Sequence, residues 1–118
     1  MSFLQTPNLL MLSRFLDLAS MRQTLVSTNL ANVDTPGYHT RDINFHGELE
    51  RAMNSAADDG MSPFVVPVQG LLARPDGNNV NLERESMLLA EVQLQFKAAT
   101  AILHTEFAEI HTAIREGQ

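Results

Sequence analysis

The sequence lacks cysteine and tryptophan, has one tyrosine, and contains only 6% aromatic residues among its 118 positions. Without cysteine, disulfide bridges and thiolate metal sites are excluded. So few rings make a ring-filled sandwich or barrel core a poor match, whereas the aliphatic, alanine and methionine content suits packed helices. We therefore expect a mainly all-α fold with little or no β structure.

Basic residues are also scarce, with 8 lysines and arginines against 14 acids and a formal net charge of −6. A nucleic-acid-binding protein normally presents a basic face to the phosphate backbone, so nucleic acid is not an expected partner. Uninterrupted apolar runs of about 18 residues are missing, so direct membrane insertion is not expected. Residues 1–12 lack a basic region and a small-residue cleavage site, which predicts that no signal peptide is cleaved.

Patterns that carry enzyme chemistry are missing as well. The sequence shows no Ser-His-Asp arrangement, glycine-rich phosphate loop or paired carboxylates at catalytic spacing. His104 and His111 are seven residues apart, whereas a helical metal pair prefers a spacing of three or four. We therefore expect no catalytic residue, no metal, no cofactor and no enzymatic activity.

What is present divides the chain into three segments that we expect to form one structural unit. Residues 1–33 predict an N-terminal helix, and residues 81–118 predict a C-terminal helix. Residues 34–80 hold four of the five prolines and five of the six glycines, which predicts a turn motif and an irregular segment that could order only on assembly. Within this middle segment, Phe45–Met53 could form a short helix, and Phe64–Val68 at best a short edge strand.

Both terminal segments carry an apolar seam with steps of three and four residues, from Leu9 to Val33 and from Leu89 to Ile114. Thr6, Asn81 and Gly117 fit the ends of these helices. We expect the two long helices to pack as a coiled-coil-like pair that gains stability from neighbouring proteins. The predicted helix-packing interface consists of Leu12, Leu16, Ala19, Val26, Leu30, Leu89, Val92, Phe96, Ala99, Leu103, Phe107 and Ile110.

The most distinctive string is NLANVDTPGY, at residues 29–38, which is typical of a helix end followed by a tight turn. Asn32 tolerates the left-handed conformation in which many helices end. Pro36 is preset for the first central position of a turn, and Gly37 supplies the positive φ of the second. Asn29 can bond to nearby backbone and fix the direction in which the chain leaves the helix.

The full string resembles the signature of the flagellar axial proteins of the rod and hook family, and within that family it fits the subunits of the proximal rod best. Arg41, Asp42 and Phe45 follow the string as they do in that family, and a second family-like string begins at Asp76-Gly77-Asn78. The resemblance covers roughly residues 14–50 and 75–115. The family motif and its turn comprise Asn29, Asn32, Asp34, Thr35, Pro36, Gly37, Tyr38, Arg41, Asp42, Phe45, Asp76, Gly77 and Asn78.

The resemblance implies a non-enzymatic structural subunit of the bacterial flagellar basal body, within the rod that crosses the periplasmic space. It also implies synthesis in the cytoplasm, export without a cleaved signal peptide by the flagellar type III apparatus, and assembly through the terminal helices. Implied partners are other rod subunits, further copies of the chain, a FliE-type adaptor and a FliF-type ring protein. Two alternatives stay open: a helical adaptor or chaperone that binds partner helices, and another rod subunit of the same family.

Overall fold

The computed structural model describes residues 7–54 and 62–117. The element order is α1 (Pro7–Ala31), β1 (Arg41–Ile43), α2 (Phe45–Asn54), β2 (Val65–Pro67) and α3 (Leu82–Glu116). The molecule is elongated, with extents of 68 × 27 × 18 Å. The prediction of a mainly all-α fold with two long terminal helices is confirmed.

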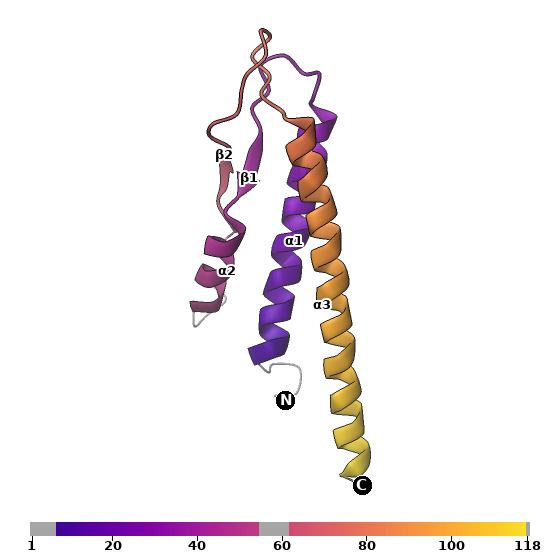
Figure 1. The fold of residues 1–118 in the computed structure, drawn as a ribbon. Helices are drawn as coiled ribbons and strands as arrows, with labels where there is room; N and C mark the ends of the chain where they lie inside the picture. The colour runs from indigo at the N-terminus through magenta and orange to yellow at the C-terminus, as the bar shows by residue number, and fades with distance from the viewer. Residues whose placement is uncertain (1–6, 55–61, 118) are drawn as a thin grey trace.

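Two long helices form an antiparallel hairpin, with the start of α1 and the end of α3 toward its open end (Figure 1). At 1.5 Å per residue, the 25 residues of α1 span about 38 Å and the 35 residues of α3 about 52 Å. Because α3 is longer, its C-terminal turns extend beyond the start of α1 (Figure 1). We call residues 107–116 of α3 the overhang.

The ends of the helices follow local chemistry. Asn81 caps α3, because its side-chain oxygen accepts a hydrogen bond from the backbone N–H of Arg84 at 3.0 Å, as predicted. Glu83 and Glu85 place negative charge in the first turn of α3. α1 ends at Ala31, so Val33, the last residue of the predicted seam, lies in the turn that comes after it. The predicted cap at Thr6 lies outside the described residues.

The middle segment, residues 34–80, is more regular than predicted, because it contains β1, α2 and β2. α2 forms where the short helix was expected, and it lies against α1, where Phe15 and Phe45 meet edge to face with ring centroids 5.2 Å apart. β2 pairs antiparallel with β1, in the register Arg41 to Pro67 and Ile43 to Val65. All three residues of β2 are exposed, as suits an edge strand containing proline.

The core is small and lies mainly between α1 and α3, with the short sheet at its edge. Its buried apolar residues are Leu9, Leu18, Ala19, Val26, Ile43, Val80, Val92 and Ala99. Among the described residues, an almost equal number of polar or charged residues is buried, namely Asn29, Thr40, Asp42, Glu48, Asn78, Asn79 and Glu85. Most of these polar residues lie near the closed end of the hairpin, where the connections meet the helices.

Candidate functional site

The turn predicted from Pro36-Gly37 is present. The backbone N–H of Tyr38 donates to the carbonyl of Thr35 at 3.2 Å, and Gly37 has φ +76°. The prediction for Asn32 is wrong, because no residue other than glycine has positive φ in the described ranges. Asn32 instead ends the helix through its side chain, which donates to the carbonyl of Thr28 at 2.8 Å and accepts from the Thr35 hydroxyl at 3.0 Å.

The second string, which begins at Asp76, lies directly on this turn. The N–H of Gly37 donates to the carbonyl of Asp76 at 2.9 Å, and the Asn78 side chain donates to the carbonyls of Asn32 and Thr35 at 2.8 and 2.9 Å. Gly77 has φ +87°, and a side chain there would begin 3.3 Å from the α-carbon of Gly37. The two strings that carried the family resemblance are therefore one structural feature.

Replacing Gly37 tests the turn alone. A Cβ at this position would meet nothing within 4 Å, so the cost of Gly37→Val comes from backbone conformation rather than from a clash. Holding a β-branched residue at positive φ costs roughly 1–3 kcal/mol, which should lower the denaturation midpoint. Gly37→Asn is the matched control and should retain most of the stability, because asparagine adopts this region more readily. Equal midpoints for the valine and asparagine variants would contradict the conformational explanation.

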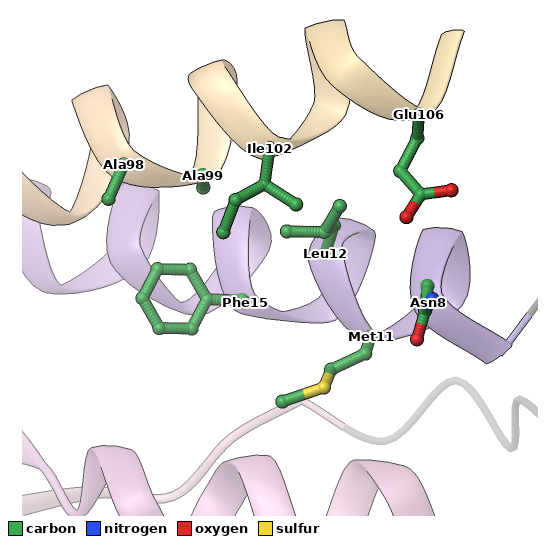
Figure 2. Close-up of a pocket in the computed structure, with 8 residues that line it drawn as sticks. All are labelled: Asn8, Met11, Leu12, Phe15, Ala98, Ala99, Ile102 and Glu106. Atoms are coloured by element: carbon green, nitrogen blue, oxygen red, sulfur yellow. The ribbon is translucent and has the colours of Figure 1, made fainter. Parts of the chain in front are cut away.

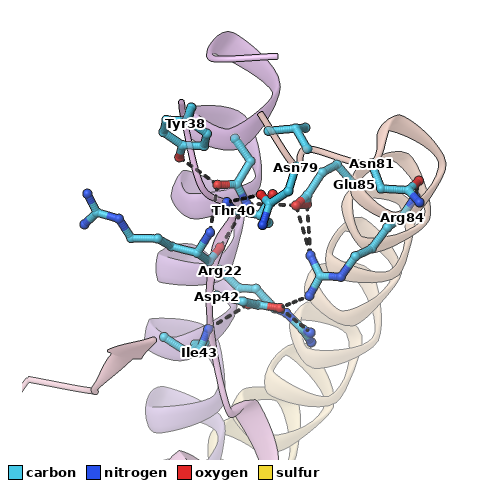
Figure 3. Close-up of polar contacts among 12 residues, drawn as sticks. Arg22, Tyr38, Thr40, Asp42, Ile43, Asn79, Asn81, Arg84 and Glu85 are labelled. Atoms are coloured by element: carbon cyan, nitrogen blue, oxygen red, sulfur yellow. Dashed lines mark hydrogen bonds and ion pairs between the residues drawn. The ribbon is translucent and has the colours of Figure 1, made fainter. Parts of the chain in front are cut away.

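Below the turns lies a layer that we call the polar clamp, formed by Arg22, Asn29, Tyr38, Asp42, Arg84 and Glu85 (Figure 3). It joins α1, the segment around β1 and the first turn of α3. The contacts of the polar clamp span up to 56 positions of sequence. The polar clamp thus links the three segments that the sequence separates.

Asn29 is the centre of the polar clamp and is only 1% exposed. Its side-chain oxygen accepts from the Tyr38 hydroxyl at 2.8 Å and from the N–H of Arg41 at 3.2 Å. Its side-chain nitrogen donates to the carbonyl of Arg41 at 2.9 Å and to Glu85 Oε1 at 2.8 Å. Both donors and both acceptor positions of the amide are used, which makes the buried polar group favourable. The predicted bond from Asn29 to backbone is confirmed.

Charges alternate through the rest of the polar clamp. Asp42 accepts from Arg22 at 3.1 and 3.2 Å and from Arg84 at 2.7 Å. Arg84 also donates to Glu85 Oε1 at 2.9 Å. Burial raises the pKa of the Glu85 carboxyl group, against the opposing effect of the Arg84 charge. Burial likewise raises the pKa of the Tyr38 hydroxyl.

The structure also places the remaining motif residues. Asp34, Pro36 and the side chain of Arg41 are exposed, while Phe45 packs on Phe15. Arg74, two residues before the second string, donates a hydrogen bond to the carbonyl of Val33. Sequence reasoning missed Arg84 and Glu85 as partners in the polar clamp. The only local signal is an acid in the first turn of α3, which the helix dipole explains without any such partnership.

The predicted helix-packing residues differ widely in exposure. Ala19, Val26, Val92 and Ala99 are at most 2% exposed. Phe107 is 47% exposed, because it lies in the overhang. The others are partly exposed, namely Leu12, Leu16, Leu30, Leu89, Phe96, Leu103 and Ile110. The hairpin therefore covers the middle of the α3 seam and leaves its C-terminal part open.

An apolar groove lies between α1 and α3 near the open end of the hairpin, with a volume of about 370 Å³ (Figure 2). Its walls are Met11, Leu12 and Phe15 from α1 and Ala98, Ala99 and Ile102 from α3, and Asn8 and Glu106 lie at one end. The groove leads into the overhang, where Phe107 and Ile114 are 47% and 48% exposed. Groove and overhang together give this end an apolar surface, which we call the open-end surface.

Metal-binding and membrane-spanning features are both missing from the part of the chain that the structure describes. Across residues 7–54 and 62–117, no three histidine, aspartate or glutamate side chains gather in a way that could hold a metal ion. Helices within these ranges also fall short of the combined length and apolarity that crossing a bilayer requires.

Comparison with known proteins gives a consistent set of relatives, although no family model matches the chain. The chain is 31% identical to the flagellar basal body rod protein FlgB of Borrelia hermsii, over 86% of this chain and 91% of that protein. It is 30% identical to FlgB of Escherichia coli K12 and 29% identical to FlgB of Salmonella typhimurium LT2, in each case over 86% of this chain and 88% of the relative. A match over 86% of the chain necessarily includes the polar clamp and part of each terminal helix.

Proposed function

The chain belongs to the FlgB family of flagellar basal body rod proteins, and from this premise we propose that the open-end surface is where it joins its neighbours. Members of this family are structural subunits and not enzymes. The chain is therefore a structural subunit of the flagellar basal-body rod, located in the basal body and associated with other rod components. A subunit with this role needs surfaces that bind other subunits, and the open-end surface has the chemistry of one.

The observation that carries the proposal is the uncovered continuation of the α3 seam. α1 covers α3 as far as the groove, where Asn8 and Glu106 lie at the same end. Beyond that point the seam continues through Phe107, Ile110 and Ile114 without a covering helix among the described residues. A helix face with this spacing buries itself against another helix, so the natural occupant is a helix of a neighbouring subunit.

Exposed apolar side chains extend the same surface onto both helices. Met11 of α1 and Ile102 of α3, which line the groove, are 47% and 51% exposed. Scattered apolar residues are ordinary on a protein surface, but a groove that leads into an apolar helix stripe is typical of an interaction site. Burial of these side chains between subunits would supply the association energy that the small core of one subunit lacks.

The finer placement of the subunit is part of the same proposal. We propose that it occupies the proximal part of the rod in the periplasmic space, after export by the flagellar type III apparatus. A FliE-type adaptor, a FliF-type ring protein, other rod subunits and further copies of this chain would then be its neighbours. Family membership favours this structural role over a helical adaptor that binds its partners reversibly, and the FlgB relatives favour it over other rod subunits.

Because the chain has no cysteine, a single introduced thiol reports on this surface without interference. We expect Ile114→Cys to react readily with a maleimide in the purified chain and to be protected in isolated basal bodies, where a neighbouring helix covers it. Thr112→Cys, on the opposite face of the same turns, is the matched control and should stay more reactive than Ile114→Cys after assembly. Equal labelling of Ile114→Cys before and after assembly would refute the proposed surface.

A further inference from the structure

We propose that Glu85 makes the polar clamp a proton-sensitive latch, which holds the turn layer on the two helices more firmly when this carboxyl group is protonated. The turn layer consists of residues 35–42 and 74–80. This inference is independent of the open-end surface, because the polar clamp lies near the opposite end of the hairpin (Figures 1 and 3).

Geometry distinguishes Glu85 from the other acid of the polar clamp. Asp42 is held by two guanidinium groups, from Arg22 of α1 and Arg84 of α3, and also accepts from the N–H of Ile43 at 2.7 Å. Glu85 has one guanidinium, that of Arg84, which it shares with Asp42. Glu85 Oε2 has only the long 3.4 Å contact to Arg84. The negative charge of Glu85 is therefore balanced by fewer positive charges and hydrogen bonds than that of Asp42. Glu85 is nevertheless the more buried of the two, with 0% exposure against 6% for Asp42.

The groups that face Glu85 come from every element around it. Arg84 lies beside it on α3, and Asn29 of α1 donates to it. The negative charge of Asp42 in β1 raises the pKa of Glu85, and Asp42 is itself paired with Arg22 of α1. The Glu85 charge also raises the pKa of the Tyr38 hydroxyl in the turn, and the Arg41 charge lowers it. Protonation of Glu85 would remove the buried negative charge that repels Asp42. Asp42 would then be the only charged partner of the Arg84 guanidinium in the polar clamp.

The direction of the pH effect is set by linkage. Burial raises the pKa of Glu85 in the folded chain above its ordinary value of 4.5. Between 4.5 and the raised pKa, the folded state binds more protons than the unfolded state, so this group favours folding increasingly as the pH falls. The contribution is complete below pH 4.5 and is lost as the pH rises through the folded pKa. The latch therefore tightens toward mildly acidic pH and loosens toward neutral pH.

A direct test needs only the wild-type chain. In an NMR titration of the full chain, the Glu85 side-chain carboxyl carbon should change shift with a midpoint above pH 4.5. Over the same interval, the amides of Arg41 and Asn79, which bond to Asn29 Oδ1 and the carbonyl of Tyr38, should become more protected from exchange as the pH falls, after correction for intrinsic rates. A Glu85 midpoint at or below 4.5 would overturn the proposal even if every variant failed to fold.

Two variants separate a latch from a static ion pair. Glu85→Gln removes the titration, so the ratio of its unfolding constant to that of the wild type should rise as the pH falls from about 7 to about 4.5. All other titratable groups are common to the two chains, so this ratio isolates Glu85. Glu83→Gln removes one acid from an exposed position in the same turn of α3 and should not reproduce that trend. A Glu85→Gln ratio that stays constant with pH, or an equal trend for Glu83→Gln, would exclude the latch.

Discussion

Val26→Asp should leave the purified chain without its cooperative helical fold. Val26 is 1% exposed in α1 and belongs to the small apolar core between the two long helices. The change removes a buried aliphatic side chain, worth about 1.5–3 kcal/mol, and introduces a carboxylate with no partner at that position. We expect a combined loss of at least about 4 kcal/mol, which is comparable to the total stability of a small domain. Circular dichroism during a urea titration would measure it.

Two matched variants show whether burial is the cause. Ser27→Asp places the same charge one residue further along α1 at an exposed position, and should change the free energy of unfolding by no more than about 0.5 kcal/mol. Val26→Ala removes only the apolar contact and should lie between the wild type and the aspartate variant. If Val26→Asp and Ser27→Asp unfolded at the same urea concentration, Val26 could not lie in a packed interface between α1 and α3.

The long helices could be predicted because their signals are local and repeated. The three-and-four spacing of apolar residues identifies α1 and α3, and Asn81 marks the start of α3 at a position that the structure confirms. The same spacing puts the end of α1 at Val33, whereas the helix ends at Ala31. Periodicity reports which residues could share a helix face, and it does not report where backbone hydrogen bonding stops.

The polar clamp could not be predicted because its energy comes from contacts between distant segments. Glu85 near a helix start is fully explained by the helix dipole, so nothing local indicates that it is 0% exposed and bonded to Asn29. Asn29 was correctly expected to bond to backbone, but its partners also include the side chains of Tyr38 and Glu85, which come from two other segments. Asn32 shows the same limit, since its helix-ending role is played by side-chain bonds rather than by a left-handed backbone.

The seam also shows what spacing cannot decide. Val92 and Phe107 both belong to the repeating apolar pattern, yet Val92 is fully buried and Phe107 is 47% exposed. The difference arises because α1 is shorter than α3, which no repeat within α3 reveals. Residues that keep the core spacing but lie beyond the covering helix are therefore the ones whose partner is expected to come from another subunit.

Phe107→Glu should abolish rod assembly while leaving the isolated chain folded. Because Phe107 is partly exposed in one subunit, a charge there should alter the free energy of unfolding by no more than about 0.5 kcal/mol. In the assembled rod, the proposed neighbouring helix would bury that charge without a partner, at a cost of about 3–5 kcal/mol for each contact. Such a cost weakens each contact by a factor of about 10²–10⁴. Swimming in soft agar, in a strain lacking the wild-type chain, would measure the loss.

Phe107→Leu and Thr112→Glu complete this design, because they separate the chemistry of the seam from its position. The leucine variant keeps an apolar side chain in the stripe and should retain swimming, since a helix groove tolerates substitution within the apolar class better than a charge. Thr112→Glu places a charge on the opposite face of the same helix and should interfere less than Phe107→Glu. If Phe107→Glu supported normal swimming, the overhang could not be a buried contact between subunits, whatever the exposure of its apolar residues in the single chain.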